Sequence, residues 1–144
     1  MKLTIYIDGA CRFNPGPAGI GVWIIGDEGR TIAEISEYIG EATNNVAEWG
    51  AYLRALKEAL ALGAGEAVIF TDSKLLAEQV RGTFKVRDPR LQGFWREAKR
   101  LEPKFTRMTL THIPRENNKR ADALSKKAVE GRPRQSEKPA AEAP

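Results

Sequence analysis

Two apolar runs, far apart in the chain, each end on an aspartate. The first spans residues 2–7 and is followed by Asp8, and the second spans residues 67–71 and is followed by Asp72. Neighbouring strands lie about 5 Å apart, so two parallel strands would bring these carboxylates together at one edge of a sheet. Like charges this close raise the pKa of one carboxyl group or need a cation between them. A divalent metal is the simplest partner, and carboxylate-bound Mg2+ usually serves phosphate chemistry.

The residues from the first run to the second predict strands and a helix in the order typical of an α/β domain. Strands are expected at 2–8, 19–25 and 31–39, the last two joined by the turn 26–29. After Asn45 the apolar residues recur with a helical period, up to Gly63, and a strand follows at 67–71. A strand, a crossover helix and a strand form a right-handed unit, so the first and fourth strands are expected to be parallel neighbours.

The second half of the chain predicts three helices and one strand. Helices are expected up to Val80, over 89–101, and from a cap at Asn118 to Val129, with a strand at 106–113. Together these elements predict an α/β domain over residues 1–130, with a mixed five-stranded sheet of three antiparallel and two parallel strands flanked by helices. Residues 131–144, rich in Pro, Ala and charge, are expected to form a disordered tail.

Length and composition favour a single domain in a reducing compartment. The chain has 144 residues, 42% of them hydrophobic, which suits one domain with a proper core. Its one cysteine, Cys11, has no partner for an internal disulfide. The first apolar run is too short for a signal peptide or a membrane span. We therefore expect a cytoplasmic protein with no membrane association.

Charge is distributed unevenly along the chain. Residues 1–80 hold 6 basic and 11 acidic side chains, whereas residues 81–107 hold 9 basic and 3 acidic ones. A basic segment of this kind can neutralise phosphates. The alternative is a solvated helix face with no ligand.

Four acidic residues are candidate metal ligands, although each also has a structural alternative. Asp8 could be a turn residue, and Glu48 could form a capping box with Asn45. Asp72 could belong to a helix cap, and Asp122 could stabilise the first turn of the last helix. All four are expected at the end of a strand or the start of a helix, at the sheet edge where open α/β folds bind ligands.

The same residues belong to short motifs that, taken together, resemble type 1 ribonuclease H. The motifs appear in the family's order between about residues 2 and 129 and are Asp8-Gly9-Ala10, Asn14-Pro15-Gly16-Pro17, Thr43-Asn44-Asn45, Thr71-Asp72-Ser73, Ile113-Pro114-Arg115-Glu116-Asn117-Asn118 and Ala121-Asp122-Ala123-Leu124. The resemblance implies that Asp8, Glu48, Asp72 and Asp122 hold two Mg2+ ions, for which Mn2+ can substitute. It implies hydrolysis of the RNA strand of an RNA/DNA hybrid, largely independent of base sequence, leaving 5′-phosphate and 3′-hydroxyl ends.

The resemblance also implies roles for residues that contact the substrate. Asn14, Asn44 and Asn45 would contact the sugars and backbone of the RNA, and Thr43 would contact a phosphate of the DNA strand. Turn and cap chemistry is the alternative for these residues. His112, ten residues before Asp122, would shuttle a proton or help product release, or else be structural.

One departure from the family pattern concerns the stretch after the third acid. Some family members carry a long basic protrusion with tryptophans there, whereas this chain has only residues 81–88, so it resembles the shorter form. Residues 84–87 could still contact the DNA strand, or they could form a simple loop. Trp23, Trp49 and Trp95 are expected to pack in the interior.

Two competing functions remain open from the sequence. One is a nuclease of the same superfamily that prefers double-stranded RNA or RNA-DNA junctions. The other is a hybrid-binding module without chemistry, against which the presence of all four acids argues. We expect a monomer with no obligate protein partner.

Overall fold

The computed structural model describes residues 1–132, and the positions 133–144 of the expected tail lie outside the described residues. The element order follows the sequence expectation. The elements are β1 (Lys2–Cys11), β2 (Gly16–Ile25), β3 (Thr31–Ala42), α1 (Asn44–Ala61), β4 (Glu66–Thr71), α2 (Lys74–Arg81), α3 (Pro89–Leu101), β5 (Arg107–His112) and α4 (Lys119–Glu130), with short 3-10 turns at Glu102–Lys104 and Arg115–Asn117. The extent of the tail therefore stays a prediction.

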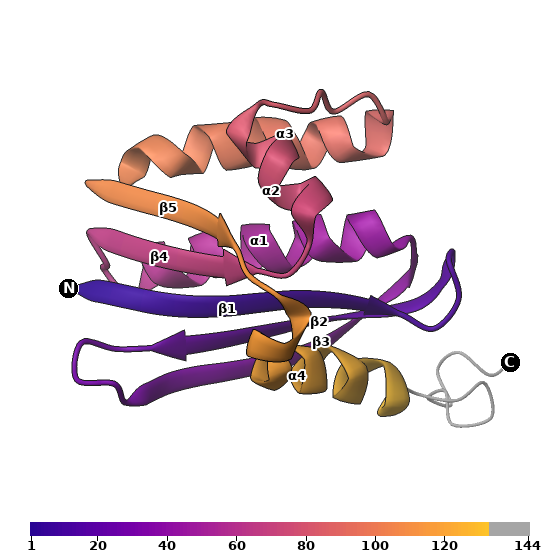
Figure 1. Cartoon of the computed structure of the whole chain (residues 1–144), viewed down its shortest axis with the longest axis horizontal. Helices are drawn as coiled ribbons and strands as arrows, with labels where there is room; N and C mark the ends of the chain where they lie inside the picture. The colour runs from indigo at the N-terminus through magenta and orange to yellow at the C-terminus, as the bar shows by residue number, and fades with distance from the viewer. Residues whose placement is uncertain (133–144) are drawn as a thin grey trace, which may run out of the picture.

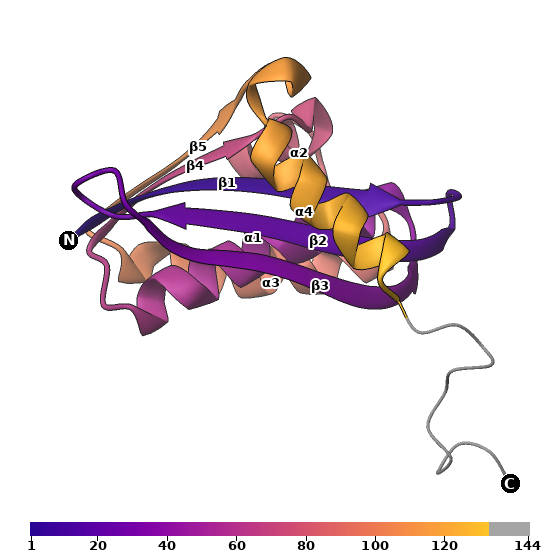
Figure 2. The same cartoon turned by 90° about the horizontal axis from the view of Figure 1, so that it is seen from below.

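The strands form one mixed sheet in the order β3-β2-β1-β4-β5. The pairs β1–β2 and β2–β3 are antiparallel, and β1–β4 and β4–β5 are parallel. Helices α1 and α3 cover one face of this sheet and α4 crosses the other (Figures 1 and 2). The predicted five-stranded α/β fold is confirmed.

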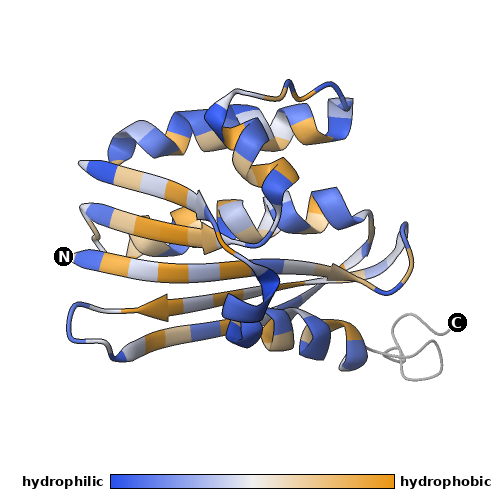
Figure 3. Ribbon diagram, viewed as in Figure 1, coloured by the Kyte–Doolittle hydropathy of each residue, from blue (hydrophilic) through white to orange (hydrophobic). Residues whose placement is uncertain are grey.

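The core lies between the sheet and α1. Alternate residues of β1, including Leu3, Ile5 and Ile7, are fully buried on the face toward this helix. Figure 3 shows the same alternation as orange bands along the strands. Trp49 of α1 is completely buried, as predicted. The expectation for Trp95 was wrong: it is 37% exposed on the surface of α3.

Strand β1 is longer than the sequence predicted. Its pairing with β4 ends at Ile7 and Thr71, whereas its pairing with β2 continues as far as Cys11 and Ala18. Asp8 is therefore inside a strand, and its interpretation as a turn residue was wrong. Residues 8–11 extend beyond the last paired residue of β4, which leaves one side of this stretch free for other groups.

Two glycines let helices approach the sheet closely. A Cβ atom on Gly9 would lie 2.5 Å from the backbone of Ala47 in α1. On the other face, a Cβ atom on Gly21 would overlap the Ala121 carbonyl oxygen and lie 2.7 Å from the Ser125 nitrogen, both in α4. Glycine at these positions lets the helix backbones touch the strands. This contact determines where the acidic side chains of both helices lie.

Candidate active site

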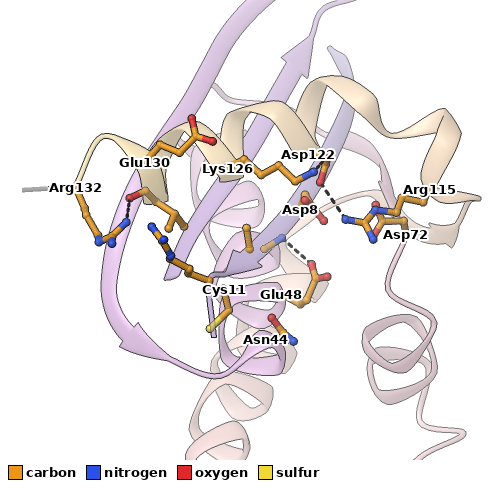
Figure 4. Close-up of a pocket in the computed structure, with 14 residues that line it drawn as sticks. Asp8, Cys11, Asn44, Glu48, Asp72, Arg115, Asp122, Lys126, Glu130 and Arg132 are labelled. Atoms are coloured by element: carbon orange, nitrogen blue, oxygen red, sulfur yellow. Dashed lines mark hydrogen bonds and ion pairs between the residues drawn. The ribbon is translucent and has the colours of Figure 1, made fainter. Parts of the chain in front are cut away.

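Three of the four predicted acids form one cluster. Asp8, Glu48 and Asp72 each offer a carboxylate oxygen, and these oxygens all lie within 4.8 Å of one another. Asp122 is not part of this close group but lines the same cleft, which has a volume of about 640 Å³. Figure 4 shows the four acids around this cleft. The structure therefore brings together all four residues that the sequence singled out.

The parallel pairing of β1 and β4 places the two aspartates side by side. Ile7 and Thr71 are the last paired residues of β1 and β4. Asp8 and Asp72 follow them directly and therefore lie next to each other. Asp8 is only 4% exposed. Ser73 caps α2 by accepting a hydrogen bond from the Leu76 N–H at 3.1 Å. The Asp72 side chain is therefore not needed as a cap.

Glu48 reaches the cluster by a different local structure from the predicted one. Helix α1 begins at Asn44, and its cap is Thr43, whose hydroxyl accepts a hydrogen bond from the Val46 N–H at 3.2 Å. The capping box between Asn45 and Glu48 was therefore wrong. Instead, the Gly9 N–H donates to Glu48 Oε1 at 2.8 Å. This bond joins α1 to β1 across the cleft.

Asp122 is the acid with cationic neighbours. It lies in the first turn of α4, where Lys126 Nζ is 3.0 Å and Arg115 3.7 Å from its carboxylate oxygens (Figure 4). Asn118 holds the N-cap position of this helix, as predicted, but its side chain does not cap it. Its amide nitrogen donates to the Ile7 carbonyl at 2.8 Å and to Asp72 Oδ2 at 3.1 Å.

Burial and mutual repulsion disfavour the charged forms of Asp8 and Glu48. Burial, followed by the charge of Asp72, raises the pKa of Asp8 to about 7, although a hydrogen bond from Ser125 opposes the shift. Burial also raises the pKa of Glu48 well above its ordinary value, with repulsion from Asp8 and Asp72 adding to the effect. A bound cation would reverse both effects. The donor set of hard carboxylate oxygens matches the ligands that Mg2+ and Mn2+ prefer.

These shifts predict that the metal-free protein loses stability as the pH rises from about 4 to about 7. In this range folded Asp8 and Glu48 keep protons that the unfolded chain has released, so the free energy of unfolding falls with pH. Melting temperatures in EDTA between pH 5 and 8 measure the effect, and Asp8→Asn should flatten the slope. A divalent cation should stabilise the protein more at pH 8 than at pH 5, because protons compete for its ligands. An equal slope in Asp8→Asn would contradict the assignment.

A second groove adjoins the cleft and holds the predicted substrate-contacting residues. It has a volume of about 690 Å³ and shares Asn44 and Glu48 with the cleft. Its lining includes Asn14, Thr43, Asn44 and Asn45, together with Lys85 and Arg87 from the connection between α2 and α3. Asn14 Oδ1 accepts a hydrogen bond from the Asn44 N–H at 3.0 Å, so this amide also holds the start of α1.

His112 lies apart from this lining. It is the last residue of β5, is exposed, and is the register partner of Thr71. It is not one of the residues that line the cleft. Its role as a catalytic helper stays a prediction.

Sequence reasoning missed four side chains around the carboxylates. Arg115 and Lys126 contact Asp122, and Ser125 and Asn118 donate to Asp8 and Asp72. For Asn118 and Ser125 the available signal was their spacing, because residues 118, 122 and 125 fall on one face of a helix.

Among the helices of residues 1–132, none combines the length and the apolar character that a membrane span needs.

The chain is similar to known proteins over most of its length. The family model described as "Reverse transcriptase-like" matches residues 6–128. The chain is 42% identical to the "Bifunctional protein Rv2228c" of Mycobacterium tuberculosis over 90% of its own length, and 39% identical to the "Ribonuclease HI" of Halobacterium salinarum, also over 90%. It spans 36% of the length of the mycobacterial relative and 65% of the halobacterial one.

A solved structure gives a similar result. The crystal structure of LC11-RNase H1 in complex with RNA/DNA hybrid superposes with a TM-score of 0.82 at 41% identity, over 89% of this chain and 96% of that one. The chain thus combines this sheet order and four acids around one cleft with a family match over most of its length. The chain belongs to the type 1 ribonuclease H family.

Proposed function

We propose that this protein is an endonuclease that hydrolyses the RNA strand of RNA/DNA hybrids, leaving 5′-phosphate and 3′-hydroxyl ends with little dependence on base sequence. The observation that carries the proposal is the cluster of Asp8, Glu48 and Asp72 within 4.8 Å, in a cleft that Asp122 also lines. The choice of substrate is supported by one relative, LC11-RNase H1, which has been crystallised in complex with an RNA/DNA hybrid.

Asp8, Glu48, Asp72 and Asp122 would hold two Mg2+ ions, for which Mn2+ can substitute. When bound, such ions activate the attacking water and stabilise the leaving 3′ oxygen. Other residues of the chain hold these carboxylates in place. The Gly9 N–H donates to Glu48 and fixes its side chain. Lys126 and Arg115 neutralise the charge of Asp122 while the site is free of metal. Release of Asp122 from these cations would accompany metal binding.

The groove beside the cleft fits the two strands of a hybrid. The amides of Asn14, Asn44 and Asn45 line one part of it and suit the sugars and backbone of an RNA strand, reached through the minor groove. Lys85 and Arg87 line another part and suit the phosphates of the second strand. In this interpretation Lys85 and Arg87, from the stretch 84–87, have a role in binding.

The location of the protein in the cytoplasm stays a prediction.

The double variant Lys85→Ala/Arg87→Ala should bind hybrid more weakly and with less salt dependence. Each lost phosphate contact lowers the slope of log K against log salt by about 1, so the slope should fall by about 2. The matched control is Lys2→Ala/Arg30→Ala, which removes the same charge from the opposite end of β1 and the turn after β2. Fluorescence anisotropy with a labelled hybrid measures both slopes, and equal slopes would contradict the assignment.

Matched substrates test the function itself. An RNA/DNA hybrid, double-stranded RNA, a DNA duplex with one RNA-DNA junction, and double-stranded DNA of one base sequence should be incubated with Mg2+ or with EDTA. We expect cleavage of the RNA strand of the hybrid, with ligatable 5′-phosphate ends, and none in EDTA. Faster cleavage of duplex RNA or of the junction would favour the superfamily alternative. Hybrid binding without any cleavage would favour a non-catalytic module.

A further inference from the structure

We propose that Ser125 and Asn118 are positioning residues that hold Asp8 and Asp72 in the orientation needed to bind metal. The inference rests on the proposed metal site and goes beyond it by assigning residues that do not touch the metal or the substrate. Asn118, the N-cap of α4, lies four positions before Asp122, and Ser125 lies three positions after it. One helix thus carries a ligand and the anchors of two others.

Ser125 holds Asp8. Its hydroxyl lies 2.8 Å from Asp8 Oδ2 and 2.9 Å from the Asp122 carbonyl oxygen, and the side chain is fully buried. A hydroxyl has one proton to donate, and an ionised carboxylate is the stronger acceptor. Ser125 therefore donates to Asp8 whenever Asp8 is charged. A carboxylate held at one oxygen keeps the direction of its other oxygen fixed.

Asn118 holds Asp72 at the point where the parallel ladder ends. The last register pair of β1 and β4 is Ile7 and Thr71, and the Asn118 amide donates to the Ile7 carbonyl just there. The same nitrogen donates to Asp72 Oδ2. A flipped amide would put an oxygen against two acceptors, so these bonds determine its orientation.

The buried side chain of Asn118 lowers the stability of the fold, because one of its polar atoms is unpaired within the described residues. It is 1% exposed, and within residues 1–132 its Oδ1 atom has no hydrogen-bond partner. An unpaired buried acceptor destabilises a fold. An apolar residue of similar size would avoid the cost, so the amide is better explained by its two donated bonds than by space filling.

The burial and repulsion in the cluster make such anchors necessary. Asp8, Glu48 and Asp72 repel one another in the absence of metal. Free carboxylates would rotate apart, and a metal ion would then have to draw them together on binding. Removing partners that orient metal ligands typically costs about 10- to 100-fold in metal affinity or activity.

Calorimetric titration of the full chain with Mn2+ tests the inference. Ser125→Ala and Asn118→Leu should each lower Mn2+ affinity by about tenfold, and cleavage should need correspondingly more Mn2+ while KM for the hybrid stays unchanged. The matched controls are Ser36→Ala, which removes a hydroxyl that donates to the α4 carbonyl of Leu124, and Asn117→Leu beside the buried amide. Both should keep the affinity of the wild type.

The outcomes separate this inference from the proposed function. Wild-type affinity in both test variants, with the wild type itself binding Mn2+, would overturn the positioning roles and leave the proposed function standing. Absence of Mn2+ binding by the wild type would overturn both. Circular dichroism identifies any variant that is unfolded at the titration temperature. If Ser125→Ala is unfolded, Ser125→Cys replaces it, since a thiol fills the site, with a slightly larger atom, but donates only weakly, and the same criteria apply.

Discussion

Asp72→Asn should lower hybrid hydrolysis by roughly a thousandfold or more, since the metal contributes several kcal/mol to the transition state. The amide keeps the shape of the side chain, and its oxygen can still accept the hydrogen bond from Asn118. It removes one of the three charges that lie within 4.8 Å of one another. The protein should therefore stay folded and bind hybrid, with an unchanged or higher melting temperature in EDTA. Single-turnover cleavage with Mg2+ measures the loss.

The control for this variant changes an aspartate of equal charge outside the site. Asp27 lies in the turn between β2 and β3, where its carboxylate accepts a hydrogen bond from the Lys2 N–H. Asp27→Asn should cleave hybrid at the rate of the wild type. Full cleavage by Asp72→Asn would show that this carboxylate does not bind a catalytic metal.

Gly21→Ala should destabilise the protein by about 1–3 kcal/mol or more, the usual effect of overpacking. The added methyl group would overlap the Ala121 carbonyl oxygen and press on the Ser125 nitrogen. Neither atom can move alone, because both belong to the backbone of α4. The helix must shift away from β2, and Asp122 moves with it. Chemical denaturation measures the loss of stability, and Mn2+ titration of the folded fraction measures the loss of affinity.

Gly50→Ala is the matched control. Gly50 lies inside α1, and a Cβ atom there would meet only Ile20 Cγ2, at an ordinary distance of 3.6 Å. Alanine favours a helix interior over glycine by about 1 kcal/mol, so this variant should be more stable than the wild type. If Gly21→Ala were equally stable and bound Mn2+ normally, close packing of α4 would not determine the site.

The sequence predicted the fold, and it predicted that the four acids would lie together, as they do around one cleft, because both follow from local patterns. Apolar runs and helical periods marked the elements, and the crossover rule made β1 and β4 neighbours. Asp8 and Asp72 followed directly, since each ends the apolar run of its strand. Glu48 and Asp122 were candidates because each was expected near the start of a helix at the same sheet edge, and the family motifs then included both.

The errors have a common physical cause in tertiary contacts. Asp8 continues a strand because β2, a distant segment, pairs with it as far as Cys11. Glu48 accepts a bond from Gly9 of another element instead of a bond in its own first turn. Trp95 has an apolar spacing, yet it is 37% exposed and lines a surface groove with residues of the connection between α2 and α3. The roles of Ser125 and Asn118 depend on how closely α4 lies against glycines of β2, which no local pattern contains.

The unequal lengths of β1 and β4 have an energetic consequence. Because β1 continues past the end of its parallel neighbour, Asp8 lies inside a regular strand, while Glu48 and Asp122 lie in helices and Asp72 directly follows β4. Their conformational entropy is lost when the chain folds, and little remains to be lost when a cation arrives. Folding thus assembles a preorganised but self-repelling site, and capture of the cation releases that stored electrostatic strain.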